Sequence, residues 1–394
     1  MTDRPARAGG QLPLLGVPDE RRLAPVTAAF ILIGLFWGAW AVSAVDVERA
    51  LGLNNGGFGL LMSAGLLGGA AGNAAGGSVT ERWGTSRVLS VSLGCWGLLA
   101  LGVASSRSHW LFGLVLLVFV GVNGVVDVAM NVAATASLSG APGYLVRFHA
   151  RFNAGAAVGA GLSGALIASH HGWRVLWLGI GTAGLALASV CARAPMPAAG
   201  SGQSTPLAGA IGVLRREGLV LVAAAFAVGA MVEGGIELWG VLYLRTQLHS
   251  GLLIGAGGSV LAYAVATAAR VSLGPAAARQ GAARGVLLGA GTAAAGAVLL
   301  ATAPLAPVAA IGLVLGAGGI SMYWPLLIAH AGAGRARPGS TVGAVTAFGY
   351  LGLMSGPGLV GLLSQGVGLR WALLVLAAGA AFVAVAPTFD RRTP

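Results

Sequence analysis

The sequence predicts an all-α integral membrane protein with twelve transmembrane helices in two six-helix halves. Of its 394 residues, 56% are hydrophobic and only 9% are charged, and the mean hydropathy is +0.84. Soluble domains carry roughly 25% charged residues, so this composition is typical of a chain that crosses the bilayer many times. The number of long apolar stretches and the placement of the arginines then give the helix count and the division into halves.

Twelve apolar stretches approach or exceed the length of about 20 residues that a transmembrane helix needs. The fourth, seventh, tenth and eleventh are long enough for their helices to tilt or to project beyond the bilayer. The stretches are residues 25–45, 57–79, 88–105, 110–138, 152–171, 173–193, 218–244, 251–269, 285–303, 306–332, 341–365 and 368–388.

The arginines test this count, because all 23 basic residues are arginine. With a cytoplasmic N-terminus, 18 arginines fall on cytoplasmic segments and 5 on outer loops, which is the bias that the positive-inside rule requires. The cytoplasmic set is Arg4, Arg7, Arg21, Arg22, Arg82, Arg87, Arg147, Arg151, Arg193, Arg215, Arg216, Arg270, Arg279, Arg284, Arg335, Arg337, Arg391 and Arg392. The outer set is Arg49, Arg107, Arg174, Arg245 and Arg370. The protein is therefore predicted to be a multi-pass protein of the cytoplasmic membrane with both termini in the cytoplasm.

The longest internal polar stretch divides the chain near its middle. It contains Pro195, Pro197 and a Gly-Ser-rich run from Gly200, a composition typical of a flexible linker. The first apolar stretch is too long for the core of a cleavable signal peptide, so it is interpreted as the first span. The predicted organisation is a cytoplasmic tail (1–24), a first half (25–193), a cytoplasmic linker (194–217), a second half (218–388) and a cytoplasmic tail (389–394).

Several other classes of protein are not favoured by the sequence. The net charge of +12 could suggest nucleic-acid binding, but the arginines lie singly or in pairs between apolar runs and form no basic patch. Cys95 and Cys191 both lie within apolar runs and indicate neither a disulfide nor a metal site. No nucleophile–base set or phosphate loop is present, so we expect no enzyme and no cofactor. The expected partners are the lipid bilayer, a small-molecule substrate and protons, and the protein is expected to be a monomer.

A carboxylate lies deep inside the fourth apolar stretch. Asn123, Asp127 and Asn131 are spaced i, i+4, i+8, so they share one face of a helix. An isolated ionised carboxylate facing hydrocarbon costs several kcal/mol or more. That face is therefore predicted to look into a polar cavity or a protein interior, where Asn123 and Asn131 contact the substrate.

A glycine and charge pattern follows the second apolar stretch, with Gly77, Glu81, Arg82, Gly84 and Arg87 at fixed intervals. It resembles the loop signature of the major facilitator superfamily, Gly-x-x-x-Asp-Arg-x-Gly-(Arg/Lys), with Glu81 in place of aspartate. A carboxylate and a guanidinium at the cytoplasmic mouth can pair across the two halves and form a latch. The alternative is a plain charged loop that obeys the positive-inside rule. In the second half, the corresponding loop near Arg270 has Pro275 where an acid is expected, so that latch is interpreted as degenerate.

Four further segments resemble the branch of this superfamily that contains fucose–proton symporters and YbjJ-type membrane proteins. They are the pair Asp127 and Asn131, residues 147–155, residues 233–245 and residues 349–357. The resemblance implies the major facilitator fold, with a substrate site between the halves near the midplane. It also implies that Asp127 is the proton carrier, because the matching acid has that role in the fucose symporters.

The candidate proton and substrate groups each have a structural alternative. Burial disfavours the charged form of Asp127, which suits proton loading and release, but the group could instead be a structural aspartate neutralised by asparagine or arginine. Glu233 and Glu237 share one face of the seventh stretch, where two close carboxylates would not both ionise. One of them could carry a proton or bind a cationic or hydroxylated substrate. Alternatively, Glu237 lies near the outer mouth and pairs with Arg245.

Aromatic residues offer candidate cavity walls. Trp37, Trp239, Tyr323 and Trp324 are predicted to line the substrate cavity, since aromatic rings stack on sugars and on drug-like rings. The alternative is anchoring at the membrane interface, which is the interpretation for three tryptophans at the ends of stretches, Trp110, Trp173 and Trp371.

The leading hypothesis is a proton-coupled secondary transporter of a small solute that works by alternating access, with Asp127 as the main coupling group. Among the apolar stretches, a Gly-Pro pair, typical of the fifth span of drug–proton antiporters, occurs only in the eleventh, at Gly356-Pro357. That observation argues mildly against such an antiporter. Export of a metabolite or drug by the same fold stays open, as does a non-transporting membrane sensor or scaffold. The sequence does not specify the substrate or the direction of transport.

Overall fold

The computed structural model describes residues 20–138, 142–194, 196, 207–273, 281–332 and 338–389, almost all of them helical. The first half consists of α1 (Glu20–Ala50), α2 (Asn55–Trp83), α3 (Thr85–Ser105), α4 (His109–Leu138), α5 (Pro142–Ala168) and α6 (Gly172–Arg193). The second half consists of α8 (Val220–Thr246), α9 (Leu252–Ala268) with the π-helix η1 (Ala269–Leu273), α11 (Ala282–Thr302), α12 (Ala306–Ile320), α13 (Tyr323–Gly332), α14 (Pro338–Val367), α15 (Leu369–Ala372), α16 (Leu374–Val385) and the short 3₁₀-helix η2 (Ala386–Phe389).

Each of the twelve predicted stretches coincides with one of these helices or with two or three consecutive helices, which confirms the predicted fold class. Nine of the helical segments in the described residues are long and apolar enough to cross a membrane. Two shorter apolar segments, Leu351–Val367 and Leu369–Val385, correspond to the eleventh and twelfth stretches. The remaining stretch is α5.

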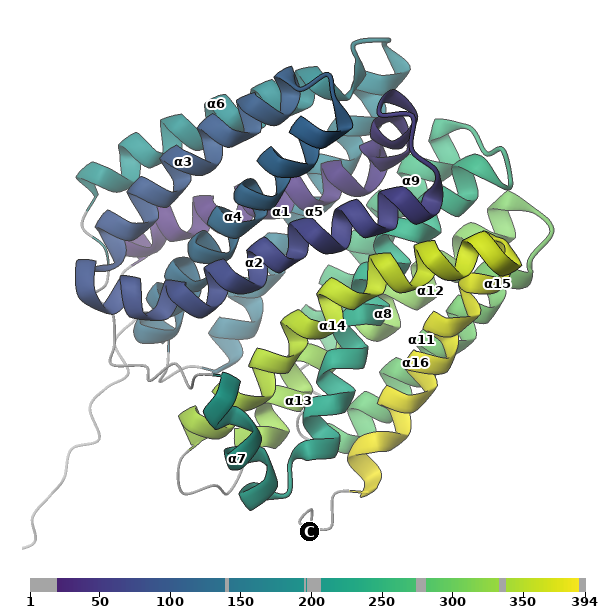
Figure 1. Ribbon diagram of the computed structural model, residues 1–394. Helices are drawn as coiled ribbons and strands as arrows, with labels where there is room; N and C mark the ends of the chain where they lie inside the picture. The colour runs from purple at the N-terminus through teal and green to yellow at the C-terminus, as the bar shows by residue number, and fades with distance from the viewer. Residues whose placement is uncertain are drawn as a thin grey trace, which may run out of the picture.

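Within each of the two halves, corresponding pairs of helices pack against each other in a similar way (Figure 1). Within the first half α1 packs on α5, α2 on α4 and α3 on α6, and within the second half α8 packs on α14 and α11 on both α12 and α16. Between the halves, α2 packs on α14 and α5 on α9. The second helix of each half therefore contacts the fifth span of the other, as two parallel six-helix repeats require.

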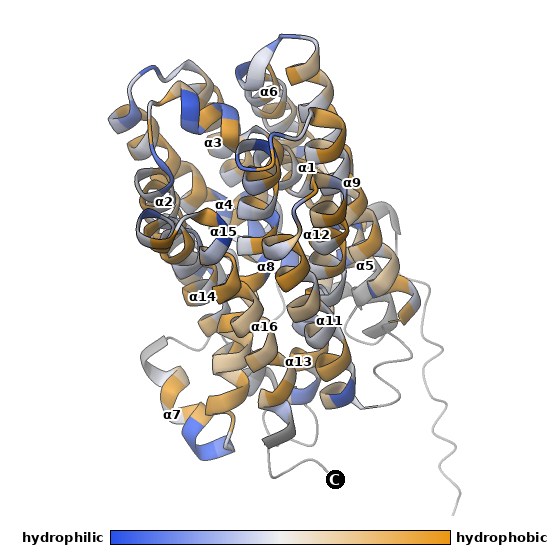
Figure 2. Cartoon of the chain, turned by 90° about the vertical axis from the view of Figure 1, so that its right-hand side faces the viewer, coloured by the Kyte–Doolittle hydropathy of each residue, from blue (hydrophilic) through white to orange (hydrophobic). Residues whose placement is uncertain are grey.

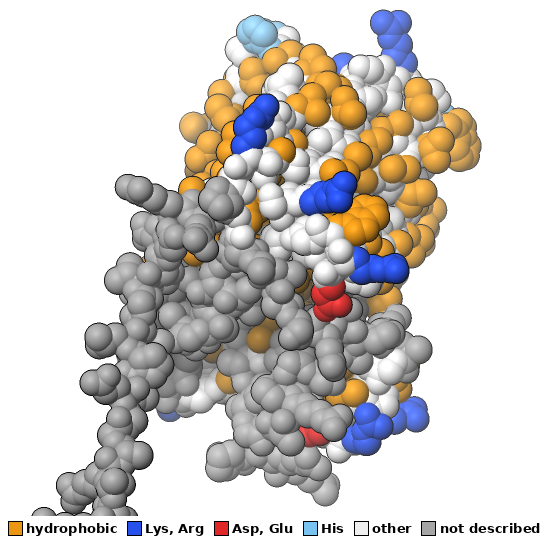
Figure 3. All heavy atoms as spheres, turned by 90° about the vertical axis from the view of Figure 1, so that its left-hand side faces the viewer, with side chains coloured by type: hydrophobic (Ala, Val, Ile, Leu, Met, Phe, Trp, Pro, Cys, Tyr) orange, Lys and Arg blue, Asp and Glu red, His pale blue; other side chains and the backbone are white. Residues whose placement is uncertain are grey.

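The outer sides of the helices are apolar along much of their length (Figure 2). Large hydrophobic side chains are exposed on several helices, among them Leu98 of α3, Leu114 of α4 and Leu253 of α9. On the face drawn in Figure 3, hydrophobic side chains cover much of the described surface and charged groups occupy isolated spots. Contiguous apolar surface of this extent is typical of contact with lipid and not with water.

Glycines bring α1 and α5 into backbone contact. A Cβ added at Gly38 would overlap the carbonyl oxygen of Ala156, and one at Gly159 would overlap that of Leu35. Gly34 and Gly155 make equivalent contacts one helical turn earlier. Such small-residue faces allow helices in lipid to approach closely, where dispersion contacts hold them together.

Two local predictions need correction. The linker was predicted to be flexible, but its last part forms the helix α7 (Leu207–Glu217), whose Ala210 and Leu214 are buried against the second half. These positions are four residues apart, so they share one helix face. The tenth stretch was predicted as one helix, but it breaks between α12 and α13 at Ser321–Met322. Pro325 explains the break, because proline lacks an N–H and clashes with the carbonyl four residues earlier, here that of Ser321.

Candidate functional site

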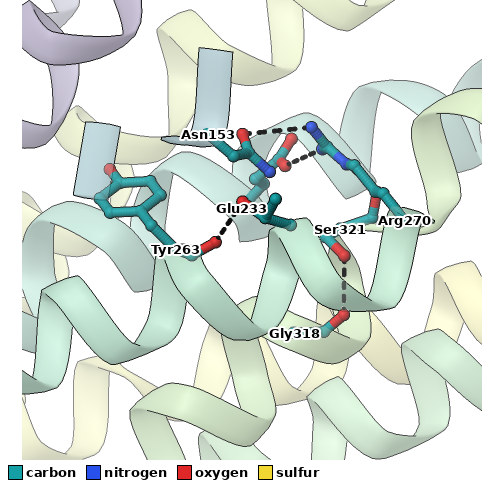
Figure 4. Close-up of polar contacts among 7 residues, drawn as sticks. Asn153, Glu233, Tyr263, Arg270, Gly318 and Ser321 are labelled. Atoms are coloured by element: carbon teal, nitrogen blue, oxygen red, sulfur yellow. Dashed lines mark hydrogen bonds and ion pairs between the residues drawn. The ribbon is translucent and has the colours of Figure 1, made fainter. Parts of the chain in front are cut away.

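An ion pair lies where the two halves contact each other (Figure 4). Glu233 is at the midpoint of α8, and its Oε1 accepts a hydrogen bond from Nη2 of Arg270 in η1 at 2.9 Å. Nη1 of the same guanidinium donates to Oδ1 of Asn153 in α5 at 3.3 Å. Arg270 therefore joins a carboxylate of the second half to an amide of the first half.

The helix break at Pro325 positions this arginine. The backbone carbonyl of Ser321 cannot accept a helical hydrogen bond from Pro325, because proline has no N–H. Instead it accepts a hydrogen bond from Nε of Arg270 at 3.0 Å. The π-helical turn η1 carries Arg270, and such turns inside α-helices are frequent at functional sites. The sequence predicts Arg270 to be a topology signal at a loop. The structure corrects this, because its guanidinium points into the interior and is only 12% exposed.

A second carboxylate lies one helical turn from the first. Glu237 is half-buried on the same face of α8 as Glu233. The hydroxyl of Tyr323 in α13 faces Glu233, and that of Tyr263 in α9 faces Glu237. The described residues of this cluster thus contribute two carboxylates, one guanidinium and two phenol groups.

Asp127 belongs to a separate polar chain within the first half. Nδ2 of Asn131 donates to the Asp127 carboxylate at 3.0 Å and to its backbone carbonyl at 2.8 Å. Oδ1 of Asn131 contacts Nε2 of His149 in α5 at 3.0 Å. Asn123, one turn before Asp127, is buried, and its Oδ1 makes no hydrogen bond to any described residue.

The aromatic residues predicted to line a cavity differ in their burial and in the rings that they contact. Trp239 is fully buried, and its ring packs edge-on against Phe58, so it presents no free face in this conformation. Trp37 is half-buried. Tyr323 is buried and Trp324 is half-buried, and both rings contact that of Phe226.

The residues of the predicted latch lie at the end of the bundle where α1 begins and η2 ends, called here the terminal end. Glu81, Arg82 and Arg87 are exposed, and no ion pair joins any of them to another residue that the structure describes. Gly84 separates α2 from α3 with a φ of 80°, a conformation that favours glycine. Gly77 is buried in the last turns of α2.

The opposite end, called here the far end, is held closed by contacts between the halves. Nη1 of Arg245 in α8 donates to Oδ2 of Asp46 in α1 at 2.8 Å and to the carbonyl of Val42 at 2.9 Å. The Gly358 N–H of α14 donates to Oγ of Ser63 in α2 at 2.9 Å. The alternative pairing of Arg245 with Glu237 is therefore wrong. Eight residues separate them along α8, which corresponds to roughly 12 Å.

Removing the far-end ion pair is expected to open this end. Asp46→Asn leaves the guanidinium of Arg245, which is 9% exposed, without its charged partner, at a cost of about 1–3 kcal/mol to the closed state. Spin labels at Ala50 and Gly366, in a background without Cys95 and Cys191, should report longer distances in the variant.

The matched control for this experiment is Arg107→Gln, which removes an exposed far-end charge that has no hydrogen bond or ion pair to another described residue. It should leave the distance distribution unchanged. Equal distributions for Asp46→Asn and the unaltered protein would show that this ion pair does not hold the far end closed.

Two six-helix halves that meet around a buried ion pair are an arrangement typical of membrane transporters. A family model of the Major Facilitator Superfamily matches residues 26–333. The chain belongs to the Major Facilitator Superfamily.

Known proteins agree with this assignment. The chain is 28% identical over 347 residues to an uncharacterized MFS-type transporter of Yersinia pestis, covering 86% of this chain and 87% of that protein. Its fold is similar to that of a point mutant of the nucleoside transporter NupG, with a TM-score of 0.76 and 11% identity over 94% of this chain and 99% of that one. It is also similar to the xylose transporter XylE of E. coli, with a TM-score of 0.73 and 14% identity over 95% and 99%. At these identities the two structures support the fold alone.

Proposed function

We propose that this transporter couples the movement of a small solute to protons, with Glu233 and Asp127 as the proton-binding carboxylates. The observation that carries the proposal is the shared guanidinium of Arg270, which is bonded to Glu233 in one half and to Asn153 in the other. The charge state of one carboxylate thereby acts on a contact between the two halves.

Protonation of Glu233 supplies the coupling step. A neutral carboxyl group no longer attracts the guanidinium as an ion, so the pair between α8 and η1 weakens. Arg270 can then change its position, and with it the contact to Asn153. A proton therefore biases the packing of α5 against α9, which is the contact that must change when the halves rock around a central site.

Asp127 is the second proposed proton site, and α5 connects it to the first. The chain from Asp127 through Asn131 ends at His149, which lies one helical turn before Asn153 on the same face of α5. Both carboxylates therefore act on one helix, and that helix packs on the other half. With the terminal end in the cytoplasm, as the arginine distribution predicts, the closed far end faces outwards.

The Asp127→Asn variant tests this function. Substrates are first found by a thermal-shift screen of the purified protein against sugars, amino acids and antibiotics, at one acidic and one alkaline pH. The protein is then placed in liposomes that contain a pH-sensitive dye. A solute that binds should change the internal pH as it crosses, and Asp127→Asn should abolish this change while sparing solute exchange.

The control is Glu217→Gln, which removes a carboxylate from the linker helix α7 and should transport normally. Solute-driven pH changes of full size in Asp127→Asn would show that this residue has no part in coupling. Solute flux without any pH change in the unaltered protein would contradict proton coupling altogether.

A further inference from the structure

Glu233 and Glu237 share one face of α8, and the carboxylate of Glu237 has no ion-pair partner among the described residues. Arg270 is ion-paired with Glu233, and no arginine or histidine of the described residues forms an ion pair with Glu237. Both glutamates lie in the interior of the bundle, where an unpaired charge is costly. A proton or a cationic ligand is needed at Glu237.

Two buried phenol groups beside the carboxylates also have unused hydrogen-bonding capacity. Tyr263 and Tyr323 are only 3% and 1% exposed, and neither hydroxyl makes a hydrogen bond of good geometry to any described residue. Their hydroxyls face Glu237 and Glu233, to which they can donate. Each phenol oxygen can then still accept a hydrogen bond from a ligand that donates one.

We propose that Glu237, Tyr263 and Tyr323 bind the protonated amino group of a small amine, which is the transported solute. An ammonium group has three N–H donors and no acceptor, which matches one carboxylate and two phenol oxygens. Its charge also compensates Glu237, which a neutral hydroxyl group cannot do. This inference rests on the proposed function, in which Glu233 is a proton site and Glu237 one turn away holds the solute.

Matched pairs of probes test the requirement for positive charge. Putrescine is compared with 1,4-butanediol, and glucosamine with glucose, by isothermal titration of the full chain in detergent. Within each pair, amino groups stand in place of hydroxyl groups, at both ends of putrescine and at one carbon of glucosamine. The amine of at least one pair should bind, and its neutral partner should bind at least tenfold more weakly.

Variants assign the binding to this site. Glu237→Gln should weaken amine binding at least tenfold, and Tyr263→Phe should weaken it less, because the carboxylate supplies the charge. Glu217→Gln should bind as the unaltered protein does. Unchanged thermal unfolding of Glu237→Gln will show that a loss of binding is not a loss of fold.

The outcomes separate this inference from the proposed function. Equal binding of amines and neutral partners, no amine binding, or full affinity in Glu237→Gln would each overturn the amine site. Proton-coupled transport of a neutral solute would also overturn it and leave the proposed function intact. Amine binding and flux without pH change would support the amine site and contradict proton coupling.

Discussion

Glu233→Gln is expected to abolish solute-driven proton movement and to destabilise the protein. Glutamine fills the same space and its carbonyl can accept from Arg270, but it carries no charge and takes up no proton. Hydrogen bonds to charged groups contribute about 1.5–3 kcal/mol, against about 1 kcal/mol for neutral ones. Since the Glu233 side chain is 24% exposed, we expect a loss near the lower end, about 1–2 kcal/mol. Proton flux in liposomes and thermal unfolding in detergent measure the two effects.

A double-mutant cycle separates coupling from stability. Arg270→Gln should also destabilise, because it leaves the Glu233 carboxylate in the interior without its cation. The double variant Glu233→Gln with Arg270→Gln removes both charges together, so it should be more stable than the sum of the single effects predicts. Proton coupling should be absent in all three variants. Additive effects on stability would mean that no ion pair forms, and retained coupling in Glu233→Gln would remove this residue from the mechanism.

The helical architecture could be predicted because it depends on properties that are local in the sequence. A run of about 20 apolar residues specifies a spanning helix, and the arginine bias constrains the number of runs. The contact between Asp127 and Asn131 is likewise local, since residues four apart meet on a helix surface. Their link to His149 depends on the packing of α4 against α5, which the sequence does not specify.

Arg270 could not be predicted as a site residue, for a physical reason. An arginine at the end of an apolar stretch has the pattern of a topology signal, and the sequence predicts that role for many arginines of this chain. Its inward position depends on the π-helical turn and on the carbonyl of Ser321 that Pro325 leaves unpaired. Pro325 is visible in the sequence, but the helix break was not predicted from it, and the arginine that bonds the freed carbonyl lies 51 positions away from Ser321.

The pair Asp46 and Arg245 was missed for a related reason. The two residues are 199 positions apart and belong to different halves, so only the packing of α1 against α8 brings them together. An acid directly after the first apolar stretch was the available signal. The role predicted for Trp239 in the cavity wall stays a prediction, and in this conformation its ring packs against Phe58 of the first half.

Gly38→Ala is expected to prevent tight packing of α1 on α5 and to lower stability by several kcal/mol. The added methyl group would overlap the backbone carbonyl of Ala156, and a backbone atom cannot turn aside as a side chain can. The helices must separate, which disturbs the neighbouring close contacts of Gly34, Gly155 and Gly159. Overpacking of side chains costs about 1–3 kcal/mol, and a clash between backbones along a whole interface should exceed that range. Thermal unfolding and size-exclusion profiles in detergent measure the effect.

Glycine to alanine at a position with free space around it should instead leave stability unchanged or raise it slightly. A methyl group at Gly179 of α6 or at Gly291 of α11 meets no atom within 4 Å. There, glycine to alanine restricts the unfolded chain and favours the helix by about 0.5–1 kcal/mol. Gly179→Ala and Gly291→Ala should therefore unfold at the same or a slightly higher temperature than the unaltered protein, whereas Gly38→Ala unfolds well below it. If all three variants behaved alike, helix propensity and not close packing would determine the effect, and the glycines of α1 and α5 would not hold these helices together. A loss of stability confined to Gly38→Ala would show that the contact between α1 and α5 requires a residue without a side chain at position 38.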